Sequence, residues 1–463
     1  MSDVTLQFLG ATHTVTGSRF LISTGTSKVL IDAGLFQGTN EIRALNWEPF
    51  PTKASTIDAI ILTHAHLDHC GYIPLLVKQG FTGKIYCTTF TRDLAEVVLL
   101  DSAHIQEEDA KYTDRKGYSS HKPALPLYTI EDAQKAIKQF EPIDFRVNQN
   151  VATDVAVTFH PSGHILGASF AEIAAAGKTF LFTGDLGRPL HPALVPPDPI
   201  PAGPFSAIVT ESTYGDRIHE TPTSEFADAI NATIKRGGII LIPAFAVDRT
   251  EVILMKLREL IENNTIPQIP VYVDSPMALA SLKFYRDAID TRSPEIRPDV
   301  ADQWAGQDPF DAGNLHEMRT VEESKSLNDI HSPAIIVSAS GMASGGRVVH
   351  HLAQLLPFDK NTVILVGYQA IGTRGRSLGD GAEHVTIHGE SVPVRAQIVK
   401  AEAFSVHADG QELEDWLKKT EKPHAVYVVH GEPESADIFA KRLHNELQWN
   451  AIVPEPNQTV AIN

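Results

Sequence analysis

The sequence predicts an α/β protein of two domains, and three observations carry this prediction. The chain has 463 residues, which is too long for one ordinary hydrophobic core. Short apolar runs that end in polar, histidine-rich segments dominate its first part, and strand-then-helix units dominate its second part. A stretch with seven prolines, from Pro189 to Pro204, separates these two patterns of predicted secondary structure. Because so many prolines exclude both a helix and a central strand, we interpret this stretch as a linker.

The first part begins with short strands separated by glycine and serine turns. The run at 57–62 is nearly all apolar, which is typical of a strand buried on both faces. Helices are predicted at 74–78 and at 91–110, the second with Thr91 as its N-cap. The strands are expected at residues 6–9, 18–22, 28–31, 57–62, 84–87, 155–159 and 179–182.

The second part alternates strands with helices. Such alternation predicts a parallel sheet with helices on both of its faces. The strands are expected at 238–243, 271–273, 335–337 and 363–366, and the helices at 248–263, 278–287 and 346–356. From about Val394 the chain carries two further motif-bearing loops and two helices, at 411–419 and 435–447.

Composition excludes a transmembrane helix and a disulfide framework. Hydrophobic residues make up 43% of the chain and charged residues 21%, as in ordinary globular proteins. No apolar run approaches the length that crosses a membrane. The first eight residues lack the basic and apolar regions of a signal peptide, and two cysteines cannot form a disulfide framework. We therefore expect a cytoplasmic protein with no membrane partner.

The net charge of −18 argues against a general nucleic-acid binder, which needs a broad basic surface. Arginines nevertheless recur at strand ends and glycine-rich turns, where their forked side chains could hold phosphate oxygens. Any one of them is more often a surface ion-pair residue. Together they predict a locally positive channel on an acidic body: Arg188, Arg217, Arg249, Arg347, Arg374 and Arg376.

Three histidines and an aspartate occur within a few residues, directly after the apolar run at 57–62. They are His64, His66, Asp68 and His69. Neutral imidazole and carboxylate are ligands that zinc prefers, and a catalytic zinc keeps one position open. With further histidines downstream, the ligands exceed what one catalytic ion needs, so we infer a site for two ions. The alternative is a solvated histidine-rich loop.

This His-x-His-x-Asp-His run resembles the signature of the metallo-β-lactamase-fold hydrolases, and further motifs follow in that family's order along the whole chain. The last three resemble the motifs of the β-CASP subfamily, which are nucleases related to the endonuclease subunit of the pre-mRNA cleavage and polyadenylation machinery. The downstream motifs are Ser162-Gly163-His164, Thr183-Gly184-Asp185, Glu211-Ser212-Thr213-Tyr214-Gly215, Phe404-Ser405-Val406-His407-Ala408-Asp409 and Val429-His430-Gly431.

The resemblance implies an α/β fold in which an αββα sandwich carries an inserted parallel-sheet β-CASP domain. We place the first part of the sandwich at 1–204, the insertion at 205–390 and the return to the sandwich at 391–463. The resemblance also implies two Zn²⁺ ions bridged by Asp185, with Mn²⁺ as an alternative because such ligands accept both metals. It assigns His64, His66, His164 and Asp185 to one ion and Asp68, His69, Asp185 and His430 to the other.

The resemblance further assigns catalytic roles to His407, Glu211 and Asp32, beside the ligand Asp68. His407 is the expected general acid for the leaving 3′ oxygen, and Glu211 would orient it. Asp32, just after the strand at 28–31, would orient a ligand histidine or the attacking water. From spacing alone, an ordinary Asp-Ala-Gly turn explains Asp32 equally well.

A glycine-rich segment at 338–347 follows a predicted strand and opens a predicted helix. Backbone amides at such a position form anion sites, although glycine-rich turns after strands are common without one. Beside a zinc site, this segment is expected to hold an RNA phosphate. The expected phosphate contacts are Ser340, Gly341, Gly345, Gly346, Arg347 and Arg374.

These motifs together predict a zinc-dependent ribonuclease that cuts single-stranded RNA and leaves a 3′ hydroxyl and a 5′ phosphate. RNA is favoured over DNA because His430 is present, whereas DNA-repair members of the family usually lack that histidine. The motif His-x-His-Leu-Asp-His, with Leu67 before the aspartate, resembles that of the polyadenylation-type branch. This resemblance favours an endonuclease over a 5′ exonuclease. The alternatives are that exonuclease, a thioester or β-lactam hydrolase of the same fold, and an inactive scaffold. The sequence does not decide the quaternary state, and a homodimer is compatible with it.

Overall fold

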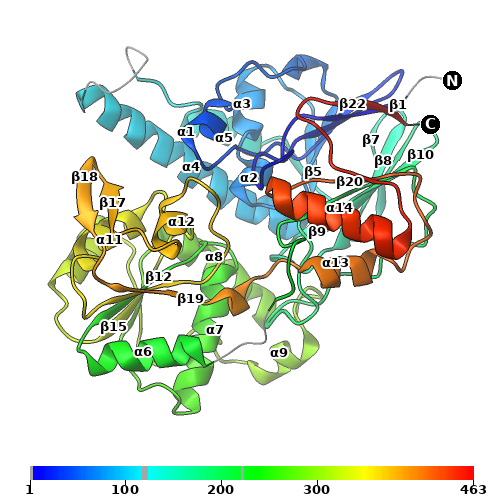
Figure 1. Cartoon of the computed structure of the whole chain (residues 1–463). Coiled ribbons are helices and arrows are strands. Elements are labelled where there is room, and N and C mark those ends of the chain that lie inside the picture. The colour runs from blue at the N-terminus through cyan, green and yellow to red at the C-terminus, as the bar shows by residue number, and fades with distance from the viewer. Residues whose placement is uncertain (1–3, 117–123, 220–223, 463) are drawn as a thin grey trace. The chain divides into compact units, whose positions relative to one another are not determined.

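The computed structural model describes residues 4–116, 124–219 and 224–462, and it divides the chain into two compact units (Figure 1). Unit 1 runs to Ile218 and resumes at His407, and unit 2 comprises His219–Val406. Unit 2 is therefore an insertion within the chain of unit 1.

Two sheets stacked face to face form the centre of unit 1. Ring contacts such as that of Phe20 with Phe182, whose centroids lie 5.9 Å apart, join the two sheets in one apolar core. The first sheet has the strand order β22 (Thr459–Ile462), β1 (Val4–Phe8), β2 (Phe20–Ser23), β3 (Lys28–Ile31), β4 (Ala59–Ile61), β5 (Lys84–Cys87) and β6 (Phe140–Pro142). The second has the order β21 (Ala451–Ile452), β20 (Val426–Val428), β11 (Ala207–Thr210), β10 (Lys178–Phe182), β9 (Ser169–Ala175), β8 (Val155–Pro161) and β7 (Asn148–Ala152).

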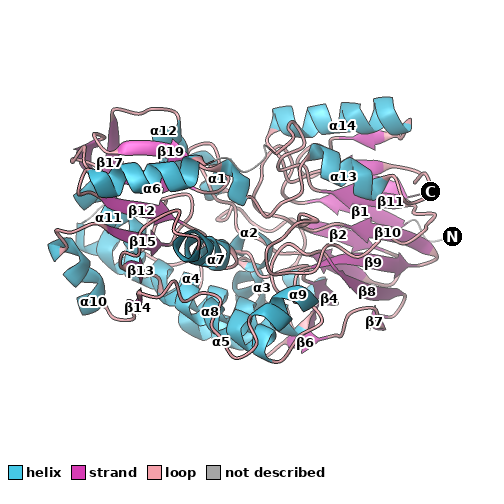
Figure 2. Ribbon diagram, turned by 90° about the horizontal axis from the view of Figure 1, so that it is seen from below, coloured by secondary structure: helices cyan, strands magenta, loops and turns pink. Residues whose placement is uncertain are grey.

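Helices cover the outer faces of this sandwich. Against the second sheet, α13 (Gly410–Leu417) and α14 (Pro433–Leu447) bury Leu413, Trp416 and Phe439, and Figure 2 shows both helices beside these strands. This arrangement confirms the predicted αββα sandwich. The other helices of unit 1 are α1 (Asn40–Ala44), α2 (Leu67–Cys70), α3 (Ile73–Lys78), α4 (Thr89–Lys116) and α5 (Ile130–Ile137), with a 3₁₀ turn at Ala54–Thr56.

Unit 2 is built on a parallel sheet, as its alternating strands and helices predict. The order is β14 (Leu315–Glu317), β13 (Val271–Val273), β15 (Ala334–Ser338), β12 (Ile239–Pro243), β16 (Thr362–Leu365) and β19 (Gln397–Lys400), and every pairing is parallel. In Figure 1, α6 lies on one side of this sheet and α11 on the other. The helices are α6 (Glu225–Lys235), α7 (Arg249–Glu262), α8 (Pro276–Asp290), α9 (Pro298–Gln303), α10 (Val321–Ser326), α11 (Arg347–Leu355) and α12 (Arg374–Gly379). A hairpin of β17 (His384–Ile387) and β18 (Glu390–Pro393) and 3₁₀ turns at Leu327–Asp329 and Glu402–Phe404 complete the unit.

The structure divides the chain at other positions than the predicted 204/205 and 390/391. β11 pairs with β10 and β20, so it belongs to the sandwich and not to the insertion. β19 pairs with β16, so the insertion continues past Val394. In both cases hydrogen bonding to a distant strand decides which unit a segment joins, and local sequence does not carry that information.

Two local predictions are wrong. The proline-rich stretch is not a linker, because it lies within unit 1 and Ile200, 6% exposed, packs into the core under α13. Thr91 is not the N-cap of the long helix, since α4 already begins at Thr89. The Thr88 hydroxyl instead accepts a hydrogen bond from the Thr91 amide at 3.3 Å.

Candidate metal centre

Most of the site residues of unit 1 follow directly or shortly after the carboxyl end of a strand. Two of them, Asp32 and His430, adopt positive φ angles of 56° and 49°, which ordinary residues rarely do and which are frequent at functional sites. Strands that end at the same edge of the two sheets thus bring together side chains far apart in sequence. After β3, β4, β8, β10, β11 and β20 these side chains are Asp32, His64, His164, Asp185, Glu211 and His430, respectively.

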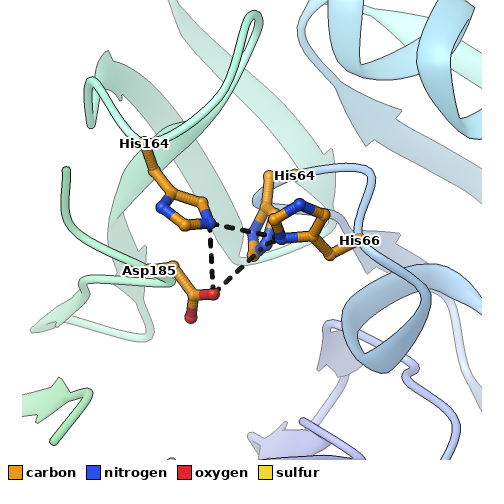
Figure 3. Close-up of side chains that lie close together, drawn as sticks. All are labelled: His64, His66, His164 and Asp185. Atoms are coloured by element: carbon orange, nitrogen blue, oxygen red, sulfur yellow. Dashed lines mark hydrogen bonds and ion pairs between the residues drawn. The ribbon is translucent and has the colours of Figure 1, made fainter. Parts of the chain in front are cut away.

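A first group of four side chains converges on one point (Figure 3). The Nδ1 atom of His66 lies 3.1 Å from Nε2 of His64 and 3.2 Å from Nε2 of His164. Oδ2 of Asp185 lies 3.4 Å from Nε2 of His64 and 3.5 Å from Nε2 of His164. These four residues are those that the resemblance assigns to one ion.

A second group meets the other oxygen of the same carboxylate. Nε2 of His69 lies 3.2 Å from Oδ1 of Asp185 and 3.2 Å from Nε2 of His430. That His430 nitrogen also lies 3.3 Å from Oδ2 of Asp68. Asp185 therefore presents one carboxylate oxygen to each group.

The spacing of these ligand atoms fits a metal ion of the size of zinc. Bonds of 2.0–2.1 Å in a tetrahedral site place neighbouring ligand atoms about 3.3 Å apart, and the separations in both groups scatter around that value. Asp185 is 2% exposed, and its Oδ1 atom accepts no hydrogen bond from any described residue. A buried carboxylate oxygen without a donor is costly unless a cation compensates it. The cluster is thus suited to bind metal.

Burial and mutual charge prepare the first group as ligands. Burial lowers the pKa of His64 to about 3 and holds the pKa of His164 well below its usual value. Both imidazoles are therefore neutral at pH 7, the form that binds a metal. Burial by itself would raise the pKa of Asp185, but the surrounding imidazoles, His430 foremost, hold it well below the usual range.

Neighbouring side chains fix the orientation of the ligand rings. Oδ2 of Asp32 lies 2.8 Å from Nδ1 of His69, and this carboxylate also accepts hydrogen bonds from the amide and hydroxyl of Thr63 at 2.8 and 2.9 Å. The Thr213 hydroxyl lies 3.1 Å from Nδ1 of His430. Sequence reasoning missed Thr63 and Thr213, although both stand inside motifs, because a threonine beside a ligand carries no signal of its own.

His407 and Glu211 lie next to the cluster. Nδ1 of His407 is 3.1 Å from Oε2 of Glu211 and 3.9 Å from Oδ2 of Asp185. The Asp409 side chain caps α13 by accepting from the Gln411 and Glu412 amides, which holds the backbone just after His407. The Glu211 carboxylate thus faces the His407 imidazole at the edge of the cluster.

Comparison with known proteins supports the resemblance to the metallo-β-lactamase superfamily and its β-CASP group. Residues 15–226 match the model of the Metallo-beta-lactamase superfamily, residues 250–378 the Beta-Casp domain, and residues 391–454 the Zn-dependent metallo-hydrolase RNA specificity domain. Ribonuclease TTHA0252 of Thermus thermophilus is 35% identical to this chain over 94% of each of the two. The chain belongs to the β-CASP group of the metallo-β-lactamase superfamily. It is therefore a member of a family of metal-dependent hydrolases.

Other relatives are similar in sequence to this β-CASP protein over nearly its whole length. The RNase J-like protein of Methanocaldococcus jannaschii is 32% identical over 97% of this chain and 98% of its own. Transcription termination factor FttA of the same organism is 30% identical over 97% of this chain and 70% of its own. A crystal structure of a protein of unknown function from Enterococcus faecalis covers 99% of this chain at a TM-score of 0.51 and 14% identity, which shows the fold alone. No helix among the described residues is long and apolar enough to cross a membrane.

The glycine-rich segment of this β-CASP protein lies in unit 2, at the end of β15. Its Ser340 hydroxyl accepts hydrogen bonds from the Ser344 and Gly345 amides, at 3.2 and 3.4 Å, so the turn closes on itself. Gly341 is required by close packing, since a Cβ there would lie 2.8 Å from the Phe245 nitrogen. Gly346, at a φ of 73°, precedes α11 without a side-chain cap.

Two of the six arginines predicted to hold phosphate oxygens, Arg347 and Arg374, have protein partners. Nη1 of Arg347 donates to Oδ1 of the fully buried Asp274 at 2.7 Å and to the Met318 carbonyl at 2.9 Å. Arg374 donates to the carbonyls of Ala343 and Thr386. These contacts do not favour Arg347 and Arg374 as phosphate ligands.

Proposed function

We propose that this protein is a dinuclear zinc ribonuclease that hydrolyses phosphodiester bonds of single-stranded RNA, cutting internally and leaving a 3′ hydroxyl and a 5′ phosphate. One observation carries the proposal: the carboxylate of Asp185 offers one oxygen to His64 and His164 and the other to His69. Two closely spaced ion sites that share a carboxylate are the arrangement of two-metal phosphodiester hydrolysis.

In this proposal the two groups of side chains each hold one ion. His64, His66, His164 and Asp185 hold the first, and Asp68, His69, Asp185 and His430 the second. When bound, such ions lower the pKa of water toward neutrality and offset the charge on the phosphoryl oxygens. Asp32 and Thr213 keep the rings of His69 and His430 turned toward the cluster.

His407 acts as the general acid that protonates the leaving 3′ oxygen. Its Nδ1 atom faces Glu211, so the proton for the leaving group comes from Nε2. Glu211 is buried and stays in place because its Oε1 atom accepts a hydrogen bond from the Leu186 amide at 2.6 Å. Glu211 thereby sets the tautomer and orientation of His407.

The names of the relatives support RNA as the substrate. The Thermus protein is named a ribonuclease, and the model matched at residues 391–454 describes an RNA specificity domain. The choice of internal cleavage rests on Leu67, which resembles the polyadenylation-type branch, and it leaves 5′ exonuclease activity as the alternative. The relatives named above are not described as thioester or β-lactam hydrolases.

We further propose a cytoplasmic enzyme, because Cys70 and Cys87 are free, buried thiols, as in reducing compartments. Mn²⁺ is the alternative metal, since imidazole and carboxylate ligands accept it. Homodimer formation is a separate hypothesis that light scattering of the purified protein tests.

Cleavage of a uniformly labelled single-stranded RNA tests the proposed function. The holoenzyme is compared with and without chelator, on a matching DNA, on a β-lactam reporter, and beside His64→Ala and His407→Ala. Chelator-sensitive RNA cutting that both variants lose is the expected result. Internal fragments indicate an endonuclease, and mononucleotides a 5′ exonuclease. A metal-loaded protein that cleaves the reporter and no RNA contradicts the proposal.

A further inference from the structure

The loop of residues 10–17 in unit 1 is unusual in the hydrogen bonding of its backbone amides. Among the described residues, none accepts a hydrogen bond from an amide of this loop. Most of the loop is buried, with Ala11 0% and Thr16 2% exposed. Roughly nine in ten or more buried amides in proteins are paired. A continuous run of unpaired donors is therefore unusual, and it offers hydrogen bonds to an acceptor outside this unit's own chain.

The loop is attached to the metal cluster at both ends. The Ala11 carbonyl accepts a hydrogen bond from the amide of His430 at 2.8 Å. At the other end, the Ser18 amide donates to the Asp68 carbonyl at 2.9 Å, and the Ser18 hydroxyl lies 3.3 Å from Nε2 of His69. Residues 10–17 thus arch between two ligand-bearing segments of the cluster.

The backbone conformation of the loop suits an anion. Ala11 and His13 have positive φ angles of 51° and 57°, whereas Thr12 and Thr14 between and after them do not have positive φ. A left-handed residue beside a residue of right-handed or turn conformation can turn successive amides toward one side, which forms a concave cradle of N–H groups. Left-handed φ is costly for alanine and histidine, and such strain persists where it serves a site.

We propose that the amides of residues 10–17 bind a phosphate group of the substrate next to the scissile one. This inference rests on the proposed function and deepens it, because it names where a neighbouring phosphate sits. His13 and Thr14 are the partly exposed residues of the loop through which the phosphate enters, and the imidazole of His13 is 34% exposed. Uncharged backbone donors explain how a protein of net charge −18 can hold a polyanion at this point.

One nearby group opposes an anion and sets the approach. Oε2 of Glu455, 76% exposed, lies 3.4 Å from Nε2 of His13. The phosphate therefore meets the loop amides and not the outer edge of the His13 ring. Ordered water that hydrates the amides is the competing occupant, and the test below separates the two.

Hydrogen–deuterium exchange of the holoenzyme tests the cradle directly. Inorganic phosphate is the probe, and chloride at equal ionic strength is the control. The exchange rates of the amides of residues 10–17 in chloride are the reference. Saturating phosphate is expected to slow them by about tenfold, the effect of hydrogen bonds to a charged group. Peptides at 62–70 and 183–187 report any phosphate held by the ions instead, and unchanged exchange at 10–17 overturns the proposal.

A matched pair of variants at Thr14 tests whether the backbone amide of this residue contributes to RNA binding. Thr14→Pro removes one donor, and Thr14→Ala keeps it while removing the same hydroxyl. The proline variant is expected to raise KM for single-stranded RNA about tenfold relative to the alanine variant, with equal metal content. Equal KM in the two variants overturns the proposal. If the proline variant does not fold, the exchange measurement on the natural protein decides.

The two proposals fail in distinguishable ways. Protection of residues 10–17 by phosphate in an enzyme that cuts no RNA refutes the proposed function and leaves the anion cradle. RNA cutting without such protection refutes the cradle and leaves the ribonuclease.

Discussion

The Nδ1 atom of His407 lies 3.1 Å from Oε2 of Glu211, and the two residues come from segments almost two hundred positions apart in the chain. Glu211 is 1% exposed and receives the Leu186 amide on its other oxygen at 2.6 Å. The Leu186 amide thus holds the carboxylate in place, and the carboxylate in turn contacts the imidazole at Nδ1. Oδ2 of Asp185, 3.9 Å from the same imidazole nitrogen, keeps this pair at the edge of the metal cluster.

Removal of His407 is expected to lower kcat without loss of metal. General acid catalysis contributes about 10²- to 10⁴-fold, so His407→Ala should lose that factor in RNA cleavage while the metal content stays unchanged. Glu211→Gln should cost less, because the imidazole remains. Metal analysis and single-turnover cleavage measure both effects, with exposed His424→Ala as the control. Loss of metal in His407→Ala would assign this residue to the cluster instead.

Substitution of Asp185 is expected to release both ions, whereas a histidine of one group releases one. Asp185 is the residue whose two oxygens face both groups, so Asp185→Ala should leave less than about 0.2 ions per chain. His164→Ala should leave about one ion, since the second group keeps its ligands. Elemental analysis of the purified proteins counts the ions. Equal loss in both variants would contradict a bridging role for Asp185.

Asp32→Asn is expected to weaken metal binding by about 10- to 100-fold, the usual effect of removing a carboxylate that orients a ligand histidine. The loss should affect the second group, because Asp32 contacts His69 at 2.8 Å. Competition with a chelator measures the affinity. Asp58→Asn is the matched control, since that exposed carboxylate accepts a backbone amide at 2.7 Å away from the cluster. An ordinary turn role for Asp32 predicts equal metal affinity in the two variants.

Glu251→Gln is expected to stabilise the protein at alkaline pH. Burial, and then the neighbouring Asp248, raise the pKa of Glu251 well above its usual value of 4.5. The folded state therefore keeps a proton that the unfolded state releases above about pH 4.5, and the free energy of unfolding falls as pH rises through the folded-state pKa. Glutamine removes this loss, so the free energy of unfolding should rise at pH 8, with a smaller gain at pH 5. Exposed Glu259→Gln is the control, and a destabilising Glu251→Gln at pH 8 would show that the carboxylate is needed.

Arg347→Met distinguishes a structural from an RNA-binding arginine. Because Arg347 pairs with the fully buried Asp274 at 2.7 Å, its loss should destabilise the protein by about 3 kcal/mol. KM for RNA should change by less than about twofold. Denaturant unfolding and cleavage kinetics measure the two quantities, and Arg292→Met, which breaks an exposed ion pair with Asp302, is the control. Raised KM with unchanged stability would restore Arg347 as a phosphate contact.

The sequence by itself determined the layers of the fold and the composition of the metal cluster. Alternating strands and helices predicted the parallel sheet of unit 2, and the apolar run at 57–62 predicted a buried strand, because hydrophobic periodicity is a local property. His64, His66 and His69 were evident because histidines crowded at a strand end serve no packing role. The resemblance added His164, Asp185 and His430, whose separate motifs would otherwise read as ordinary turns.

Only the tertiary structure decided which of these groups meet and what the arginines contact. His69 and His430 are 3.2 Å apart across most of the chain, and β11 and β19 join their units through pairing with distant strands. The ion pair of Arg347 with Asp274 and the unpaired amides of residues 10–17 are likewise evident only from the tertiary structure. Contact energies and hydrogen bonds depend on distance in space, which the order of residues along a chain does not contain.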